Sequence, residues 1–155
     1  MRSVTYLPQL LTVAVLSTAA VAKTPSLFPL DLPFIAVSLN GQSYAAKSPT
    51  LTIKHDPKTN ALAGAGFAGC NQWAGRVTLD GERFNVAHLG ATKMFCTSQA
   101  TAEANFLTAL KSVTRWSMDG PTLVLEGEQT KLLFAPVPEK KLRSEERRVG
   151  KECRL

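Results

Sequence analysis

The chain has 155 residues, of which 45% are hydrophobic and 19% charged, and this composition excludes collagen-like and wholly disordered proteins. Its net charge of +6 would suggest nucleic-acid or anionic-membrane binding if the charges were spread over the whole chain. Residues 23–138, however, hold ten basic and eight acidic side chains, whereas residues 139–155 hold seven basic and four acidic ones. The part that is long enough to fold as one domain is therefore nearly neutral, and nucleic acid is not an expected partner.

The first 22 residues are typical of a secretory signal peptide. Arg2 supplies a short positive region, residues 10–20 are apolar, and a small-x-small site ends at Ala22, so cleavage before Lys23 is expected. The apolar run is shorter than the roughly 18–20 residues that span a bilayer, so no stable membrane anchor is expected after cleavage. No cysteine lies near the site for lipid attachment. We therefore expect an exported, periplasmic protein.

Residues 137–155 are expected to form a disordered tail, because mixed charges follow a Pro-Val-Pro break without apolar periodicity. The string also resembles sequence at the ends of unrelated predicted chains, which favours read-through from vector or assembly sequence over a native tail. The alternative is a basic arm for nucleic acid or lipid. Acids interleave with its bases, however, and no aromatic residue is present for stacking.

The mature chain is expected to begin with an extended lead-in over residues 23–33, which contain three prolines. Strands should follow in segments separated by turn residues, of which Asn40-Gly41 and Asp80-Gly81 are the strongest hairpin signals. The expected strand segments are 34–39, 51–55, 61–68, 76–79, 83–86, 122–126 and 130–135.

One amphipathic helix is expected before the last two strands, because apolar residues recur at helical spacing over residues 102–113. Thr97 or Ser98 should cap its start, and Asp119-Gly120-Pro121 should end it. The pattern predicts an α+β domain over residues 34–136, in which a compact antiparallel β-sheet or partial β-barrel is covered by this helix.

A glycine-rich segment, Gly64-Ala65-Gly66-Phe67-Ala68-Gly69, matches the spacing of a dinucleotide-binding loop. Such a loop opens a helix and is followed by a carboxylate about 20 residues later, and the sequence meets neither condition. We expect no cofactor. The glycines are better explained by a bent strand or by the close approach of another backbone.

Three cysteines are present, and Cys153 lies in the suspected tail. Cys70 and Cys96 remain as an even pair, which in an oxidising compartment favours a disulfide. Free reactive thiols and a metal site are the alternatives. No C-x-x-C occurs, and neither His55 nor His88 brackets the cysteines at ligand spacing, so no metal is expected.

No catalytic constellation is recognisable from spacing. Neither histidine belongs to a nucleophile motif, so each is expected to be a surface or hydrogen-bonded residue. Trp73 and Trp116 are expected in the core or at its edge rather than as platforms for a ligand.

Three sequence blocks follow one another between residues 69 and 110. They are Gly69-Cys70-Asn71-Gln72-Trp73-Ala74-Gly75, Leu89-Gly90-Ala91-Thr92-Lys93-Met94-Phe95-Cys96 and Glu103-Ala104-Asn105-Phe106-Leu107-Thr108-Ala109-Leu110. In order and spacing they resemble the G-C-N-x-aromatic-x-G, T-[RK]-M-x-C and E-x-x-F-L-x-x-L motifs of the META domain, also called the HslJ-like family. The resemblance covers about residues 34–135.

The resemblance implies structural roles for the matched residues. The two cysteines would form a disulfide, the two glycines of the first block would provide tight backbone, Asn71 would fix a turn through its side chain, and Met94 would fill the core. The matched set is Gly69, Cys70, Asn71, Gly75, Thr92, Lys93, Met94 and Cys96.

The family has no established enzymatic reaction, and bacterial members are associated with heat or antibiotic stress. The resemblance therefore implies a non-enzymatic periplasmic domain that binds an envelope protein or an apolar ligand and helps the envelope to tolerate stress. The alternative is a small thiol-dependent or hydrolytic enzyme that uses Cys70 and Cys96.

Overall fold

The computed structural model describes residues 27–44 and 47–138, and within these ranges the chain forms nine strands and one helix. The strands are β1 (Phe34–Leu39), β2 (Gln42–Ser43), β3 (Thr50–His55), β4 (Leu62–Phe67), β5 (Gln72–Asp80), β6 (Arg83–Ala91), β7 (Arg115–Asp119), β8 (Thr122–Glu126) and β9 (Lys131–Pro136). The helix is α1 (Ala100–Ser112). All strand pairs are antiparallel, so the expected α+β class with one helix is confirmed.

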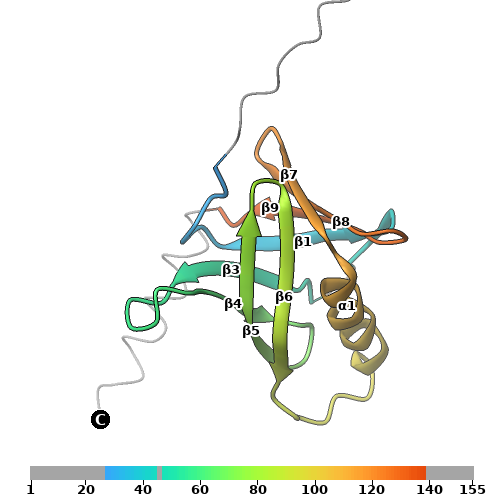
Figure 1. Cartoon of the computed structure of the whole chain (residues 1–155). Coiled ribbons are helices and arrows are strands. Elements are labelled where there is room, and N and C mark those ends of the chain that lie inside the picture. The colour runs from blue at the N-terminus through green and yellow to red at the C-terminus, as the bar shows by residue number, and fades with distance from the viewer. Residues whose placement is uncertain (1–26, 45–46, 139–155) are drawn as a thin grey trace, which may run out of the picture.

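The sheet closes on itself. Its strand order is β2-β1-β3-β4-β5-β6-β7-β8-β9, and β1 also pairs with β9 at five positions between Phe34↔Pro136 and Leu39↔Leu132. β5 and β6 stand upright in Figure 1, whereas β1, β3 and β9 cross behind them. β6 and β7 pair only at Arg83↔Arg115, so these two strands diverge beyond that point, and α1 packs beside β6.

The core fills the inside of this ring. Trp73 of β5 meets Phe106 of α1 edge-on at a ring-centroid distance of 6.3 Å, and Phe106 meets Phe134 of β9 in the same way at 6.4 Å. Trp73 is 2% exposed and Trp116 is 4% exposed, which confirms that both tryptophans belong to the core. Phe106 of the helix therefore contacts both β5 and β9, which lie on opposite sides of the closed sheet.

Residues 27–33, the described part of the expected lead-in, contain no strand but are attached to the sheet. Phe28 packs against Trp116 at 5.0 Å and against Phe84 at 6.2 Å between ring centroids. The Val137 N–H donates to the Pro33 carbonyl, so ordered chain continues just past β9. The expected signal peptide, its Ala22–Lys23 cleavage site and the tail from residue 139 onward lie outside the described residues.

The start of the helix differs from the sequence prediction. Neither Thr97 nor Ser98 caps it, because residues 97–99 form a turn and Gln99 occupies the N-cap position without a side-chain hydrogen bond. The helix nevertheless buries the predicted face, with Phe106, Ala109 and Leu110 in the core.

The predicted end of the helix was also wrong. Val113 adopts an extended conformation, so α1 stops at Ser112, and β7 occupies much of the interval that had been assigned to the helix. In β7 the apolar Trp116 and Met118 alternate with Arg115 and Ser117, which is the two-residue period of a strand. A five-residue strand that follows a helix so closely gives too short a pattern for the sequence to reveal.

The hairpin signals were correct, but β5 and β6 are longer than predicted. Asn40 and Gly41 both have positive φ (50° and 82°), as a type I′ turn requires, and β5 and β6 meet at the Asp80↔Arg83 pair. The pairing of β5 with β6 continues past a bulge between Ala74 and Arg76. The residues beyond the bulge are mostly alanine and glycine, which give little strand signal in the sequence.

One glycine of the dinucleotide-like segment lies where two backbones touch. A Cβ atom on Gly66 of β4 would collide with the backbone carbonyl of Thr50 in β3. That carbonyl also accepts a hydrogen bond from the Trp73 indole Nε1–H at 3.0 Å, so it cannot move away freely. The close backbone approach expected for these glycines is confirmed.

We predict that Gly66→Ala lowers the free energy of unfolding by about 2–3 kcal/mol, because β3 and β4 would be forced apart. Gly90→Ala is the matched control, since it also lies in a strand but a Cβ there meets nothing within 4 Å. Its stability should stay within about 0.5 kcal/mol of the wild type or rise slightly. Urea unfolding of both variants checks this, and equal stabilities would contradict it.

Candidate functional site

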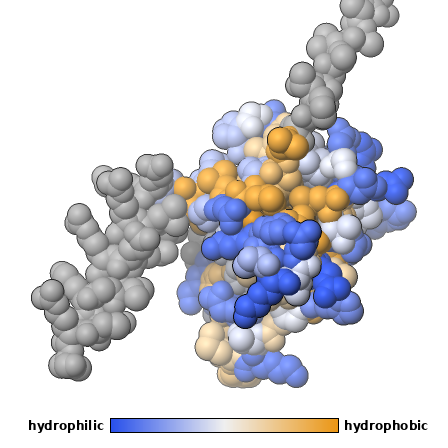
Figure 2. Space-filling view, turned by 60° about the vertical axis from the view of Figure 1, so that its left-hand side comes forward, coloured by the Kyte–Doolittle hydropathy of each residue, from blue (hydrophilic) through white to orange (hydrophobic). Residues whose placement is uncertain are grey.

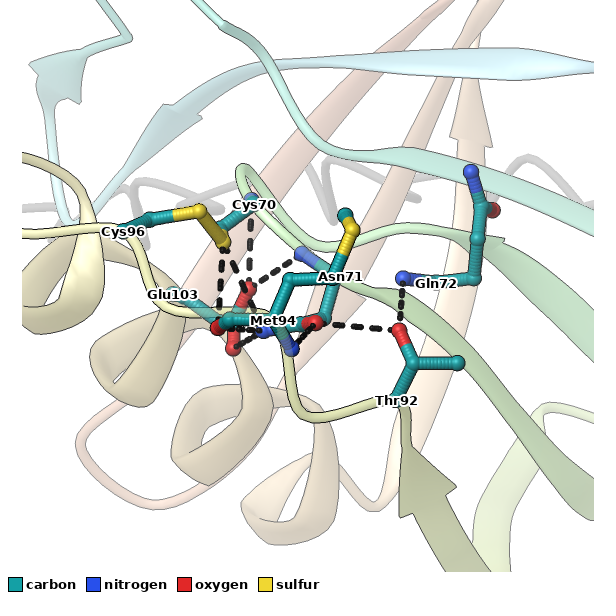
Figure 3. The surroundings of a disulfide bond; sticks show 7 residues. All are labelled: Cys70, Asn71, Gln72, Thr92, Met94, Cys96 and Glu103. Atoms are coloured by element: carbon teal, nitrogen blue, oxygen red, sulfur yellow. Dashed lines mark hydrogen bonds between the residues drawn. A yellow bond between two sulfur atoms is a disulfide. The ribbon is translucent and has the colours of Figure 1, made fainter.

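The residues of the matched blocks gather where the turn between β4 and β5 meets the loop from β6 to α1, which we call the β6–α1 loop (residues 92–99) (Figure 3). Gly69 has φ +114°, a conformation that favours glycine, and it turns the chain so that the next two residues face the loop. Cys70 and Asn71 are each 5% exposed. The turn therefore places a buried amide and a buried sulfur against the loop.

The Asn71 side chain uses its full hydrogen-bonding capacity. Its Oδ1 accepts from the Met94 N–H at 2.6 Å and from the Thr92 hydroxyl at 3.0 Å. Its Nδ2 donates to Glu103 Oε1 at 2.8 Å and to the Met94 carbonyl at 3.4 Å. Asn71 thus binds both backbone groups of one loop residue and the first turn of α1, which extends its expected role in fixing a turn.

Glu103 was missed as a site residue by the sequence reasoning. Its Oε2 accepts from the backbone N–H groups of Asn71 at 2.6 Å and Cys70 at 3.1 Å, while its Oε1 accepts the bond from Asn71 Nδ2. The available signals were its place in the E-x-x-F-L-x-x-L block and its position as the acid in the first helical turn. Side-chain contact with the distant turn could not be read from either signal.

Two opposing effects act on the pKa of Glu103. Burial is the largest single contribution and raises it, but the hydrogen bonds from the Asn71 side chain, the Asn71 N–H and the Cys70 N–H lower it. Together the hydrogen bonds outweigh burial, so the pKa lies below its ordinary value. The carboxylate is therefore the form that the folded protein stabilises.

A disulfide joins Cys70 to Cys96, with Cα atoms 6.1 Å apart. It ties the β4–β5 turn to the same loop that Asn71 binds, across a sequence separation of 26 residues. Both sulfur atoms are used in this bond, so the expected bridge is present and neither cysteine is a thiol in this structure.

The other matched residues divide between the network and its surroundings. The Thr92 N–H donates to the Gln72 carbonyl, and the Gln72 N–H donates to the Thr92 hydroxyl oxygen. Lys93 is exposed, and Gly75 lies at the bulge of β5, outside the network. Met94 does not fill the core, as had been expected: it is 61% exposed, because the Asn71 amide binds its backbone and its side chain projects outward.

Other candidate groups do not join this cluster. His88 is exposed and lines an open groove over β4 and β5 with Asp56 and Arg76, and His55 is also exposed. Within residues 27–44 and 47–138, no three His, Cys, Asp or Glu side chains are grouped so that they could hold a metal ion. In the same part of the chain, no helix is both long enough and apolar enough to cross a membrane.

The network therefore positions the β6–α1 loop. The carboxylate, the amide and both sulfurs are bound to one another or to backbone groups. Their joint effect is to hold the β6–α1 loop in one conformation, with the side chains of Met94 and Phe95 outside.

Comparisons with known proteins bear on the family and on the fold. The family model described as META domain matches residues 31–139. A search of curated proteins gave no match. Among solved structures, an NMR structure of a protein from Burkholderia xenovorans is similar, with a TM-score of 0.57 and 23% identity over 77% of this chain and 96% of that chain. A second NMR structure has a TM-score of 0.52 and 19% identity over 67% and 87% of the two chains. At these identities the two structures support the fold alone.

We predict that removing the bridge lowers stability without unfolding the domain. In a Cys153→Ser background, the double change Cys70→Ala/Cys96→Ala should reduce the free energy of unfolding by about 3–4 kcal/mol, because the unfolded chain loses a covalent loop constraint. Near-UV circular dichroism should keep its native form, since the Asn71–Glu103 contacts remain. Equal stabilities, or equal masses after alkylation with and without reductant, would show that no bridge forms.

We predict that Glu103 contributes stability above its unfolded pKa and that this contribution is lost as pH falls through its lower folded pKa. The difference in unfolding free energy between wild type and Glu103→Gln should therefore be largest near neutral pH, about 1–3 kcal/mol, and shrink as pH falls through and below the ordinary pKa range of a glutamate carboxyl. Urea unfolding across this range measures it. A difference that is independent of pH would contradict the role of the charged carboxylate.

Proposed function

Because the chain belongs to the META-domain family, we propose that it is an exported, non-enzymatic binding domain that acts in the periplasm and helps the envelope to tolerate stress. Its partner is an envelope protein or an apolar ligand, and it needs no cofactor.

The observation that carries this proposal is the way the polar groups of the site are used. Asn71 binds Glu103 and the backbone of Met94 in the β6–α1 loop, while Met94 and Phe95 turn their side chains toward solvent. Catalytic groups need access to a substrate, whereas a binding surface needs fixed, exposed side chains. The arrangement supports binding.

Two features support export. The leader over residues 1–22 has the pattern of a signal peptide, and the Cys70–Cys96 disulfide suits an oxidising compartment. The alternative, a thiol-dependent or hydrolytic enzyme, would need one of these cysteines as a thiolate or one of the two histidines as a base. A single experiment separates the two functions.

In a bacterium that carries the gene, deletion should lower survival of heat or antibiotic stress, and the wild-type chain should restore it. Leu11→Arg, which places a charge in the apolar run of the leader, should fail to restore survival because export is blocked. Met94→Ser/Phe95→Ser should also fail, because the exposed apolar side chains are removed while the folded core is untouched.

The matched controls for this experiment are His55→Ala and His88→Ala, which remove the bases that a hydrolase would use and should restore survival fully. Immunoblots of periplasmic fractions check that all variants except the leader variant accumulate equally. Survival that depends on a histidine but not on Met94 and Phe95 would overturn the binding function and favour the enzyme.

A further inference from the structure

Among the described residues, six large apolar side chains are exposed, and they fall into two groups. Leu27, Leu30, Leu32 and Val37 belong to the lead-in and β1, and Met94 and Phe95 to the β6–α1 loop. Figure 2 shows a broad apolar band across one face of the molecule. In the β6–α1 loop the two exposed apolar residues are consecutive in the chain.

The tip of the β6–α1 loop is strongly exposed and projects from the fold. Phe95 is 92% exposed and Met94 is 61% exposed, although both side chains are large and apolar. In Figure 1 the loop lies beyond the end of β6, at the lowest part of the coloured chain. Such side chains at a convex tip are typical of a contact with an apolar partner rather than of a folded core.

The backbone of Met94 is hydrogen-bonded on both sides within the protein. The N–H and the carbonyl of Met94 are both bound by the Asn71 side chain, at 2.6 and 3.4 Å. Two residues further on, Cys96 is fixed by the disulfide. A backbone that enters hydrocarbon must have its polar groups satisfied internally, and at Met94 this condition is met before any partner binds.

A positive charge lies beside the tip. Lys93 is exposed and directly precedes Met94 in the chain. The acid of this site, Glu103, already accepts three hydrogen bonds inside the network. The tip therefore presents one lysine next to two exposed apolar side chains.

From these observations we propose that the β6–α1 loop is a membrane-contact tip, with Met94 and Phe95 entering the surface of a bilayer and Lys93 binding its anionic headgroups. A fluid bilayer accepts a convex apolar tip without a matching pocket, whereas a protein partner would need a concavity of complementary shape. Charge complementarity selects anionic lipid. This inference rests on the proposed export, because the tip must reach a membrane surface outside the cytoplasm, and it names the apolar partner that the proposed function leaves open.

The contact is weak and reversible. Two apolar side chains and one lysine bury far less than a spanning helix, so the tip holds the domain near the membrane without anchoring it. The disulfide and the Asn71 amide keep the two side chains pointing outward, which lowers the ordering cost of insertion.

The test is sedimentation with vesicles of phosphatidylglycerol and phosphatidylethanolamine, compared with vesicles of phosphatidylcholine, using protein purified from the periplasmic fraction. The wild type should bind the anionic vesicles more tightly. Met94→Ser/Phe95→Ser should weaken binding about tenfold or more, and Lys93→Glu should weaken it several-fold. Val37→Ser is the control, because it removes an apolar side chain that is 45% exposed elsewhere on the surface, and it should change nothing.

All variants share the same N-terminus and tail, which mass spectrometry verifies, so the difference between the tip variant and Val37→Ser reports the loop alone. As a second readout, Phe95→Trp should shift its emission to the blue with anionic vesicles and be quenched by brominated lipid. The wild-type emission is the background, since Trp73 and Trp116 are buried.

Failure of the wild type to bind, binding that the tip variant retains, or equal binding to both vesicles would overturn the proposal. If survival of stress requires Met94 and Phe95 but vesicles do not bind, the proposed function stands with a protein partner and the membrane contact is wrong. If vesicles bind through the tip but survival does not require it, the contact stands and the proposed function fails.

Discussion

The Glu103 carboxylate accepts three hydrogen bonds from Cys70 and Asn71, and through them the first turn of α1 is joined to the turn between β4 and β5. These segments are more than 30 residues apart in sequence. Glu103 is only partly buried, and even partial burial of a carboxylate costs free energy unless hydrogen bonds compensate it. The contact therefore forms when the turn and the helix are both in place. The position of the β6–α1 loop, and with it the exposed side chains, depends on that condition.

The disulfide and the Asn71 amide stabilise the same loop by different mechanisms. The covalent bond between Cys70 and Cys96 restricts the unfolded chain, whereas the amide stabilises one conformation of the folded loop by binding both backbone groups of Met94. A loop held in two ways can expose Met94 and Phe95 without rearranging to hide them. This explains why two large apolar side chains remain exposed, although the large apolar side chains of Trp73, Phe106 and Phe134 are buried in the core.

Much of the fold could be predicted because its signals are local. The alternation of β1 and β3, the positive φ needed at Asn40-Gly41, and the helical spacing of Phe106 and Leu110 each depend on neighbours within a few residues. Predictions failed where a local pattern was too short, as in β7, or where small residues replaced apolar ones, as in the outer half of β5 and β6. Met94 was wrongly assigned to the core because its residue type suits a core, while its surroundings were not visible in the sequence.

The sequence by itself determined the family, the single amphipathic helix, most strand positions and the residue types of the site. It also determined that Cys70 and Cys96 could pair, since an even pair of cysteines behind a signal-like leader favours a bridge. Only the tertiary structure decided that the sheet closes through β1 and β9, that Glu103 serves the Asn71 turn, and that Met94 and Phe95 face outward. The physical reason is that hydrogen-bond satisfaction and burial are properties of surroundings, and segments distant in sequence supply those surroundings.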